Sequence, residues 1–265
     1  MKKVLLTLLA VMITTVPTFA ATYNAASKVP TVGANLLTKN NIPSKNVKFT
    51  VASGDVDNSN YATNKVINVS SADLAYTGND SEVAAVVANE IGHIISGHAS
   101  KGKVKNLLQA GSNANSDTAT STIISNYTSA KEEKEADIIA ADLMVTAGYN
   151  PLAIIVVLTK QTGTYWETIQ GKPANADRAM NIFNYISYAY PAKVKAGYGC
   201  AEYRNFLAFA NPEIAERKAN KKAETKLSKE LAKSKKNSAN QITKFRTRGG
   251  LSGWDAAYGL LNSAQ

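Results

Sequence analysis

Asn89, Glu90 and His93 lie in the run Asn89-Glu90-Ile91-Gly92-His93, and their side chains suit metal binding and proton transfer. Residues four apart on a helix share one face, so Asn89 and His93 point the same way, with Glu90 beside them. An imidazole nitrogen is a good zinc ligand, and a neighbouring carboxylate can take a proton from metal-bound water. Since the chain has only two His, His93 and His98, and one Cys, any metal site here needs oxygen ligands as well.

Glu133 and Asp137 provide a second pair of suitable side chains, again four residues apart. A carboxylate from another helix can supply a third zinc ligand. A further Asp one turn away can hold a ligating side chain in place by a hydrogen bond. From the residues alone, this second pair either completes a metal site with His93 or is simply solvated, as carboxylates on helices usually are.

The helix that carries the first pair is predicted over residues 80–96. Asn79 is a good N-cap, and Glu82 three residues later can reach back to it. The second pair lies in a helix predicted over 129–147, which ends at Gly148. Between them, a helix is predicted over 104–111 and a loop over 112–120.

The remaining pattern is typical of a mainly helical α+β fold with a small sheet. Residues 47–51 and 65–69 alternate as strands do, and further helices are predicted at 32–37, 150–162 and 175–188. The expected division of the chain is 1–20, a signal peptide; 21–46, a polar segment; 47–212, the main domain; 213–248, a basic helical tail; and 249–265, a C-terminal segment.

Positive charge is concentrated in the tail. Residues 215–248 hold twelve Lys or Arg and three Glu, a net charge of +9, whereas the whole chain carries +10. This pattern predicts either a solvated helix or a segment that docks on an anionic membrane or cell-wall surface. The tail lacks the interleaved aromatic residues that stack on bases, which disfavours nucleic acid as a partner.

The first twenty residues read as a secretory signal peptide. Lys2 and Lys3 precede an apolar stretch, and the small residue Ala20 offers a cleavage site. The sequence therefore predicts an exported protein, periplasmic or secreted.

Over roughly residues 47–186 the chain resembles the CAAX-prenyl-protease/HtpX-like zinc metallopeptidases, which are gluzincins. The run 80–98 resembles their active-site helix, with Glu90, Gly92, His93 and a further His at 98. The stretch 133–151 is similar to their third-ligand helix, and Lys172-Pro173 with Arg178 is similar to a downstream His-Pro and Arg element.

The resemblance implies a zincin-like domain with one zinc per chain. It makes Glu90 the general base, His93 and Glu133 zinc ligands, and Asp137 a residue that orients a ligand. His98 would also stand close behind the ligands, while Lys172 and Arg178 would supply positive charge, to a developing oxyanion for example. A protein or peptide substrate would add a strand along the sheet edge.

Two positions depart from the family pattern. Asn89 stands where the family has its first His ligand, and Lys172 stands where it has a later His. An amide oxygen is a weak zinc donor, so Asn89 is either a weak ligand or a lost one. Five residues of helix rotate His98 away from His93 unless the helix bends near Gly97. Lys172 would either oppose the metal or stabilise an oxyanion.

The resulting interpretation is an exported zinc-dependent metalloendopeptidase that acts on envelope or misfolded proteins. The alternative is an inactive pseudopeptidase that serves as a periplasmic protein-binding module, with a basic tail on anionic surfaces.

Overall fold

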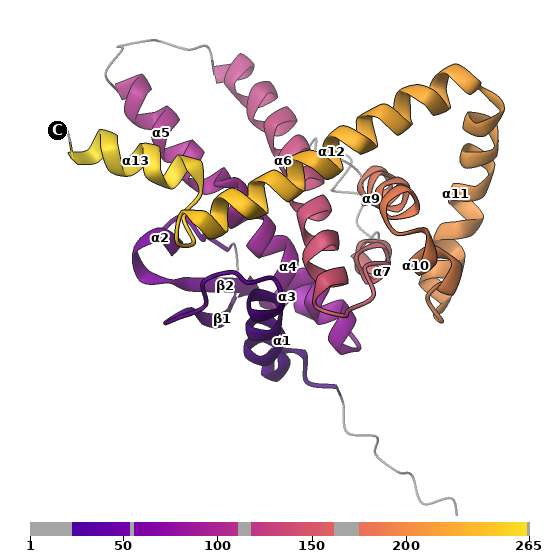
Figure 1. Ribbon diagram of the computed structural model, residues 1–265, viewed down its shortest axis with the longest axis horizontal. Coiled ribbons are helices and arrows are strands. Elements are labelled where there is room, and N and C mark those ends of the chain that lie inside the picture. Colours follow the sequence, from indigo (N-terminus) through magenta and orange to yellow (C-terminus); the bar gives the residue numbers. More distant parts are fainter. Residues whose placement is uncertain (1–22, 54–55, 111–117, 162–174, 264–265) are drawn as a thin grey trace, which may run out of the picture.

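The computed structural model describes the backbone of residues 23–53, 56–110, 118–161 and 175–263 (Figure 1), and side chains within these ranges except 106–129 and Asn262. The predicted signal peptide at 1–20 and Lys172 lie outside the described residues.

The described part of the chain is mostly helical with one small sheet, as predicted. Two parallel strands, β1 (Lys48–Ala52) and β2 (Val66–Ser70), pair with Thr50 opposite Asn68. The helices are α1 (Ala25–Lys39), α2 (Tyr61–Asn64), α3 (Ser71–Leu74), α4 (Asp80–Ser96), α5 (His98–Ala110), α6 (Thr118–Thr146), α7 (Ala153–Gln161), α9 (Asn175–Ala189), α10 (Pro191–Ala196), α11 (Ala201–Ala219), α12 (Lys221–Thr247) and α13 (Gly253–Ser263).

Helix α4 has the bounds that the sequence predicts. The Asn79 side chain accepts a hydrogen bond from the Glu82 N–H, at 3.1 Å, and caps the helix. The Glu82 carboxylate reaches back one residue further than expected, to the Gly78 N–H. Gly97 then ends the helix in the left-handed conformation (φ +68°), where a glycine has no Cβ to strain the turn.

Helix α6 packs against α4 more extensively than any other helix pair in the described residues. A Cβ placed on Gly92 of α4 would lie 2.6 Å from the Ala136 carbonyl oxygen of α6, so only glycine allows this close approach. Helix α6 begins at residue 118, eleven residues before the predicted start, so the predicted loop at 112–120 overlaps its first turn. The crossing at Gly92 places His93 opposite the carboxylates of α6.

The predicted polar segment over 21–46 contains the 15-residue helix α1, which includes the short helix predicted over 32–37 and begins seven residues before it. The inner side of α1 packs on α4. Val29, Val32, Leu36 and Leu37 are buried on that side. Pro30 and the polar residues of the outer side obscure the apolar spacing in the sequence. Helix α1 therefore contributes to the hydrophobic core of the main domain.

The basic tail is helical as expected, but one side of it is docked. Helix α12 crosses α6 and contacts α9 (Figure 1), and Leu231, Ile242 and Phe245 are buried beneath it. Its lysines, including Lys229, Lys233 and Lys236, face solvent. The predicted division at residue 212 falls inside α11, which continues to Ala219.

A buried carboxylate ties α12 to the main domain. Asp142 of α6 accepts hydrogen bonds from the hydroxyls of Tyr185 (2.6 Å), Tyr190 (2.7 Å) and Ser238 (2.5 Å). Burial raises the pKa of Asp142, although these three donors oppose the rise. Because its donors come from α9, the turn after it and α12, Asp142 joins three parts of the chain.

We expect Asp142→Asn to lower the free energy of unfolding by about 2–4 kcal/mol, since three buried hydroxyls lose a charged acceptor. Urea unfolding measures the change. Asp177→Asn is the matched control because Asp177 is exposed on α9, and it should change stability by less than about 0.5 kcal/mol. Equal stability of the two variants would contradict the proposed role of Asp142.

None of the described helices has the combination of length and apolar character that crossing a bilayer requires.

Candidate active site

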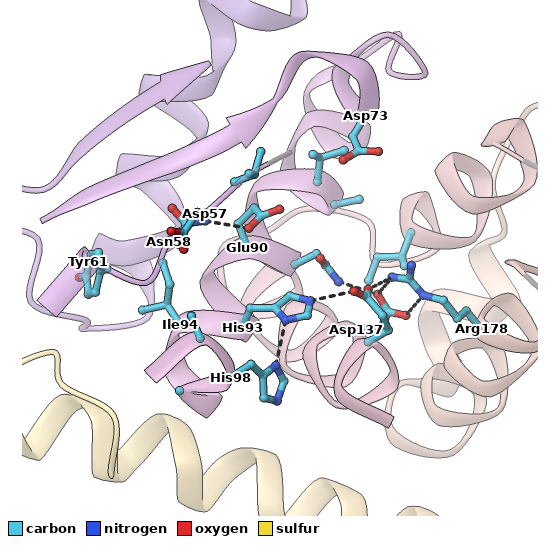
Figure 2. Close-up of a pocket in the computed structure, with 18 of the residues that line it drawn as sticks. Asp57, Asn58, Tyr61, Asp73, Glu90, His93, Ile94, His98, Asp137 and Arg178 are labelled. Atoms are coloured by element: carbon cyan, nitrogen blue, oxygen red, sulfur yellow. Dashed lines mark hydrogen bonds and ion pairs between the residues drawn. The ribbon is translucent and has the colours of Figure 1, made fainter. Parts of the chain in front are cut away.

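A pocket of about 330 Å³ lies between α4, α6, α7 and α9, and the segment 56–58 before α2 also lines it. Figure 2 shows Glu90 and His93 of α4, with Asp137 and Arg178, around this pocket. The structure thus brings together the predicted site residues from three separate helices. Asp255 of α13 also lines the pocket, so the C-terminal segment forms part of its wall.

His93 and Glu133 converge as two metal ligands would. The His93 Nε2 atom lies 3.4 Å from Glu133 Oε1. Zinc bonds of about 2.0–2.2 Å in a tetrahedron separate neighbouring donor atoms by about 3.4 Å. The observed separation therefore fits two donors on one ion, and equally an ion pair when no metal is present.

Asn89 is turned toward Asp137. Its Nδ2 donates a hydrogen bond to Asp137 Oδ1 at 2.8 Å, and Asp137 is 1% exposed. A ligating His in this position would use its Nδ1–H for the same bond, leaving Nε2 for the metal. Asn89 thus keeps the hydrogen bond of such a ligand but offers only an amide oxygen as the donor.

Arg178 from α9 forms ion pairs with two carboxylates of α6, those of Glu133 and Asp137. Its guanidinium forms two hydrogen bonds to Asp137, at 2.8 and 3.0 Å, and lies 2.9 Å from Glu133 Oε2. Burial favours a raised pKa for Glu133, but the hydrogen bond with His93 and the charge of Arg178 outweigh it and lower the pKa to about 2. Because Arg178 binds Oε2, Oε1 remains directed at His93.

His98 lies beside His93, because the left-handed turn at Gly97 changes the chain direction between α4 and α5. The two Nδ1 atoms are 2.9 Å apart. His98 therefore contacts the side of the imidazole opposite the Nε2 that faces Glu133, where it is placed to orient His93. The sequence analysis allows His98 to approach His93 only if the helix bends near Gly97, and the turn at Gly97 provides this bend.

Two residues that the sequence reasoning missed extend this contact. Glu135 Oε2 lies 3.5 Å from His98 Nε2, and Gln241 of α12 donates a hydrogen bond to Glu135 Oε1. Only the position of Glu135, two residues from Glu133 on the same helix, could have suggested it. Nothing in the local pattern around Gln241 points to a site more than a hundred residues earlier.

Glu90 lies in the pocket and has a strongly altered acidity. Burial raises the pKa of Glu90 to about 7, against the opposing effects of His93 and of a hydrogen bond from Asn58. Asn58 Nδ2 donates to Glu90 Oε2 at 2.8 Å. A carboxylate with a pKa near neutral pH is well matched to accept and return a proton. Asn58 is the third residue that the sequence analysis missed.

Zinc fits this site in part. Among the described residues, no group of three or more His, Cys, Asp or Glu side chains is placed to hold a metal ion. His93 and Glu133 supply two donor atoms at a suitable spacing. Asn89, which lies one turn before His93 on the same face of α4, could add only its amide oxygen. The donor set is therefore that of a weak zinc site, with one strong ligand fewer than catalytic zinc sites usually have.

The model of the family described as Peptidase family M48 matches residues 24–220 of this chain. The matched range includes α1, all of the predicted ligands and Arg178, and it ends before α12. No curated protein and no solved structure matches the chain significantly.

Proposed function

The chain belongs to peptidase family M48, a metallopeptidase family, and from this premise we propose that it is an exported zinc-dependent endopeptidase. Its substrates would be envelope or misfolded proteins. The observation that carries the proposal is the convergence of His93 and Glu133 in the pocket that also contains Glu90. The zinc dependence, the export and the substrate class are the parts that go beyond family membership.

The metal would be held by His93 Nε2 and Glu133 Oε1, with the Asn89 amide oxygen as a weak third donor. Bound zinc supplies Lewis acidity, which polarises a peptide carbonyl and makes bound water easier to deprotonate. Asp137 fixes Asn89, and Arg178 fixes both Asp137 and Glu133. These contacts hold the donors in place before the metal arrives, which partly offsets the weak third ligand.

Glu90 would act as the general base and then return the proton to the leaving amine. Its burial excludes competing water, and its pKa of about 7 leaves a large unprotonated fraction at neutral pH. The guanidinium of Arg178 lines the same pocket and adds positive charge near the developing oxyanion. These assignments give the two metal donors, the base and Arg178 each a role in one hydrolysis reaction.

Export rests on the sequence of residues 1–20. A protein that leaves the cytoplasm through a general export pathway enters a compartment rich in unfolded envelope proteins. An extended polypeptide is the form in which such proteins could enter a groove beside β2. This reasoning supports unfolded protein as the substrate class.

The proposal predicts that the mature protein, supplied with zinc, hydrolyses reduced and alkylated casein, and that Glu90→Gln lowers the rate by at least about 100-fold. Gel electrophoresis of the products over time measures this. Glu202→Gln is the matched control, since Glu202 lies at the start of α11 and does not line the pocket, and it should retain the full rate.

A zinc-loaded protein that cleaves no casein would contradict the proposal. Such a result would favour the alternative of an inactive peptide-binding protein. A rate that Glu90→Gln leaves unchanged would show instead that the hydrolysis comes from a contaminant or from another site.

A further inference from the structure

The outer edge of β2 is covered by the side chain of Asn58. The inner edge of β2 pairs with β1, and the N–H and C=O of Asn68 point outward. Asn58 Oδ1 accepts from the Asn68 N–H at 2.8 Å, and Asn58 Nδ2 donates to the Asn68 carbonyl at 3.1 Å. One carboxamide thus satisfies both backbone groups of the central residue of the strand.

This arrangement reproduces the bonds of a paired strand. A residue of an antiparallel neighbour exchanges one N–H and one C=O with the residue opposite it. The carboxamide of Asn58 presents the same donor and the same acceptor. Asn58 therefore occupies the positions where the backbone of an added peptide would bind to β2.

The same carboxamide also holds the candidate general base. Its Nδ2 carries two hydrogens, of which one goes to Asn68 and the other to Glu90 Oε2, at 2.8 Å. Figure 2 shows Asn58 beside Glu90, with its contact drawn between them. Binding at the strand edge and the freedom of Glu90 are therefore linked through one side chain.

We propose that Asn58 is a gate residue, whose carboxamide occupies the peptide position on β2 until an extended peptide displaces it and thereby frees Glu90 Oε2. This inference rests on the proposed function, since it requires that the pocket accept an extended peptide. The gate keeps the base bound to Asn58 while the groove is empty and releases it when a peptide backbone pairs with Asn68.

The exchange at Asn68 is balanced enough to be reversible. Each hydrogen bond that Asn58 gives up at Asn68 is replaced by one from the incoming backbone, so the net change in hydrogen bonding at Asn68 is small, and the bond to Glu90 Oε2 is the one that is lost. The Asn58 side chain is only half-buried, so its amide can find water on leaving the strand. Peptide contacts elsewhere in the pocket then decide the direction of the exchange.

The test is the affinity of the full mature protein, without added metal, for fluorescein-labelled oxidised insulin B chain, measured by anisotropy. Because Asn58→Ala removes the competing carboxamide, we expect it to bind this peptide about tenfold more tightly than the wild type. Asn58→Asp keeps the size but cannot donate to the Asn68 carbonyl, so it should also bind more tightly. Asn237→Ala, at an exposed position of α12, is the matched control and should leave affinity unchanged.

Unchanged or weaker binding by both Asn58 variants, with native circular dichroism, would overturn the gate, and so would a lack of peptide binding by every form. The measurement separates this proposal from the proposed function. If the casein assay fails while Asn58→Ala still binds more tightly, the gate stands without the peptidase. If casein is cleaved and neither variant binds more tightly, only the gate falls.

Discussion

Replacing Asn89 by His is expected to raise the affinity of the protein for zinc by more than about 100-fold. A residue that only hydrogen-bonds a metal ligand changes metal affinity by up to about 100-fold, and a new ligand should contribute more. The acceptor for the new imidazole is already in place, because Asp137 Oδ1 now binds the Asn89 amide at 2.8 Å. With its Nδ1–H on Asp137, the imidazole would direct Nε2 toward His93 and Glu133. The site would then have the three strong donors of a catalytic zinc site.

Isothermal titration with zinc measures this change, and Asn89→Ala provides the comparison. If the Asn89 amide oxygen is a weak ligand, Asn89→Ala should bind zinc somewhat less tightly than the wild type. If Asn89→His binds zinc no better than Asn89→Ala, then residue 89 does not face the metal. That result would contradict the placement of Asn89 beside His93 and Glu133.

Substituting Gly92 by Ala is expected to have the largest effect on stability of any conservative change at the site. The added Cβ would lie 2.6 Å from the Ala136 carbonyl oxygen, a contact that the backbone of α6 can relieve only by moving. Overpacking of this kind costs about 1–3 kcal/mol. Because Ala136 lies between Glu135 and Asp137, the movement would also carry these ligand-side residues away from His93.

We therefore expect Gly92→Ala to lower both the free energy of unfolding and the zinc affinity. Gly102→Ala is the matched control, since a Cβ at Gly102 of α5 meets no atom within 4 Å. The control should be neutral or stabilise the protein by up to about 1 kcal/mol, as Ala favours helix over Gly. Equal effects of the two substitutions in urea unfolding would contradict the close crossing of α4 and α6.

The residues along α4 could be predicted from the sequence because their signals are local. The cap at Asn79, the apolar spacing and the glycine at 97 lie within one helix, and the structure gives the predicted bounds. The pairing of α4 with the Glu133 helix came instead from the family resemblance. Spacing alone places Glu133 and Asp137 on one face but does not say which helix they meet.

The parts that could not be predicted depend on contacts between distant segments. Asn58 pairs with Asn68 and Glu90 through its side chain, and no periodic pattern marks such an interaction. Likewise, Asp142 looks like any helical Asp until three hydroxyls, from α9, the turn after it and α12, surround it. The first part of α1, before the predicted helix over 32–37, was obscured for a different reason, since Pro30 interrupts a segment that tertiary packing nevertheless holds as a helix.

The most direct test of the account is the zinc content of the purified mature protein, measured by elemental mass spectrometry alongside His93→Ala and Glu133→Ala. The account predicts up to one zinc per chain in the wild type and loss of that zinc in both variants, because His93 Nε2 and Glu133 Oε1 provide its two strong donors. Zinc that both variants retain, or a wild type that binds none at millimolar zinc, would contradict a metal site at this position.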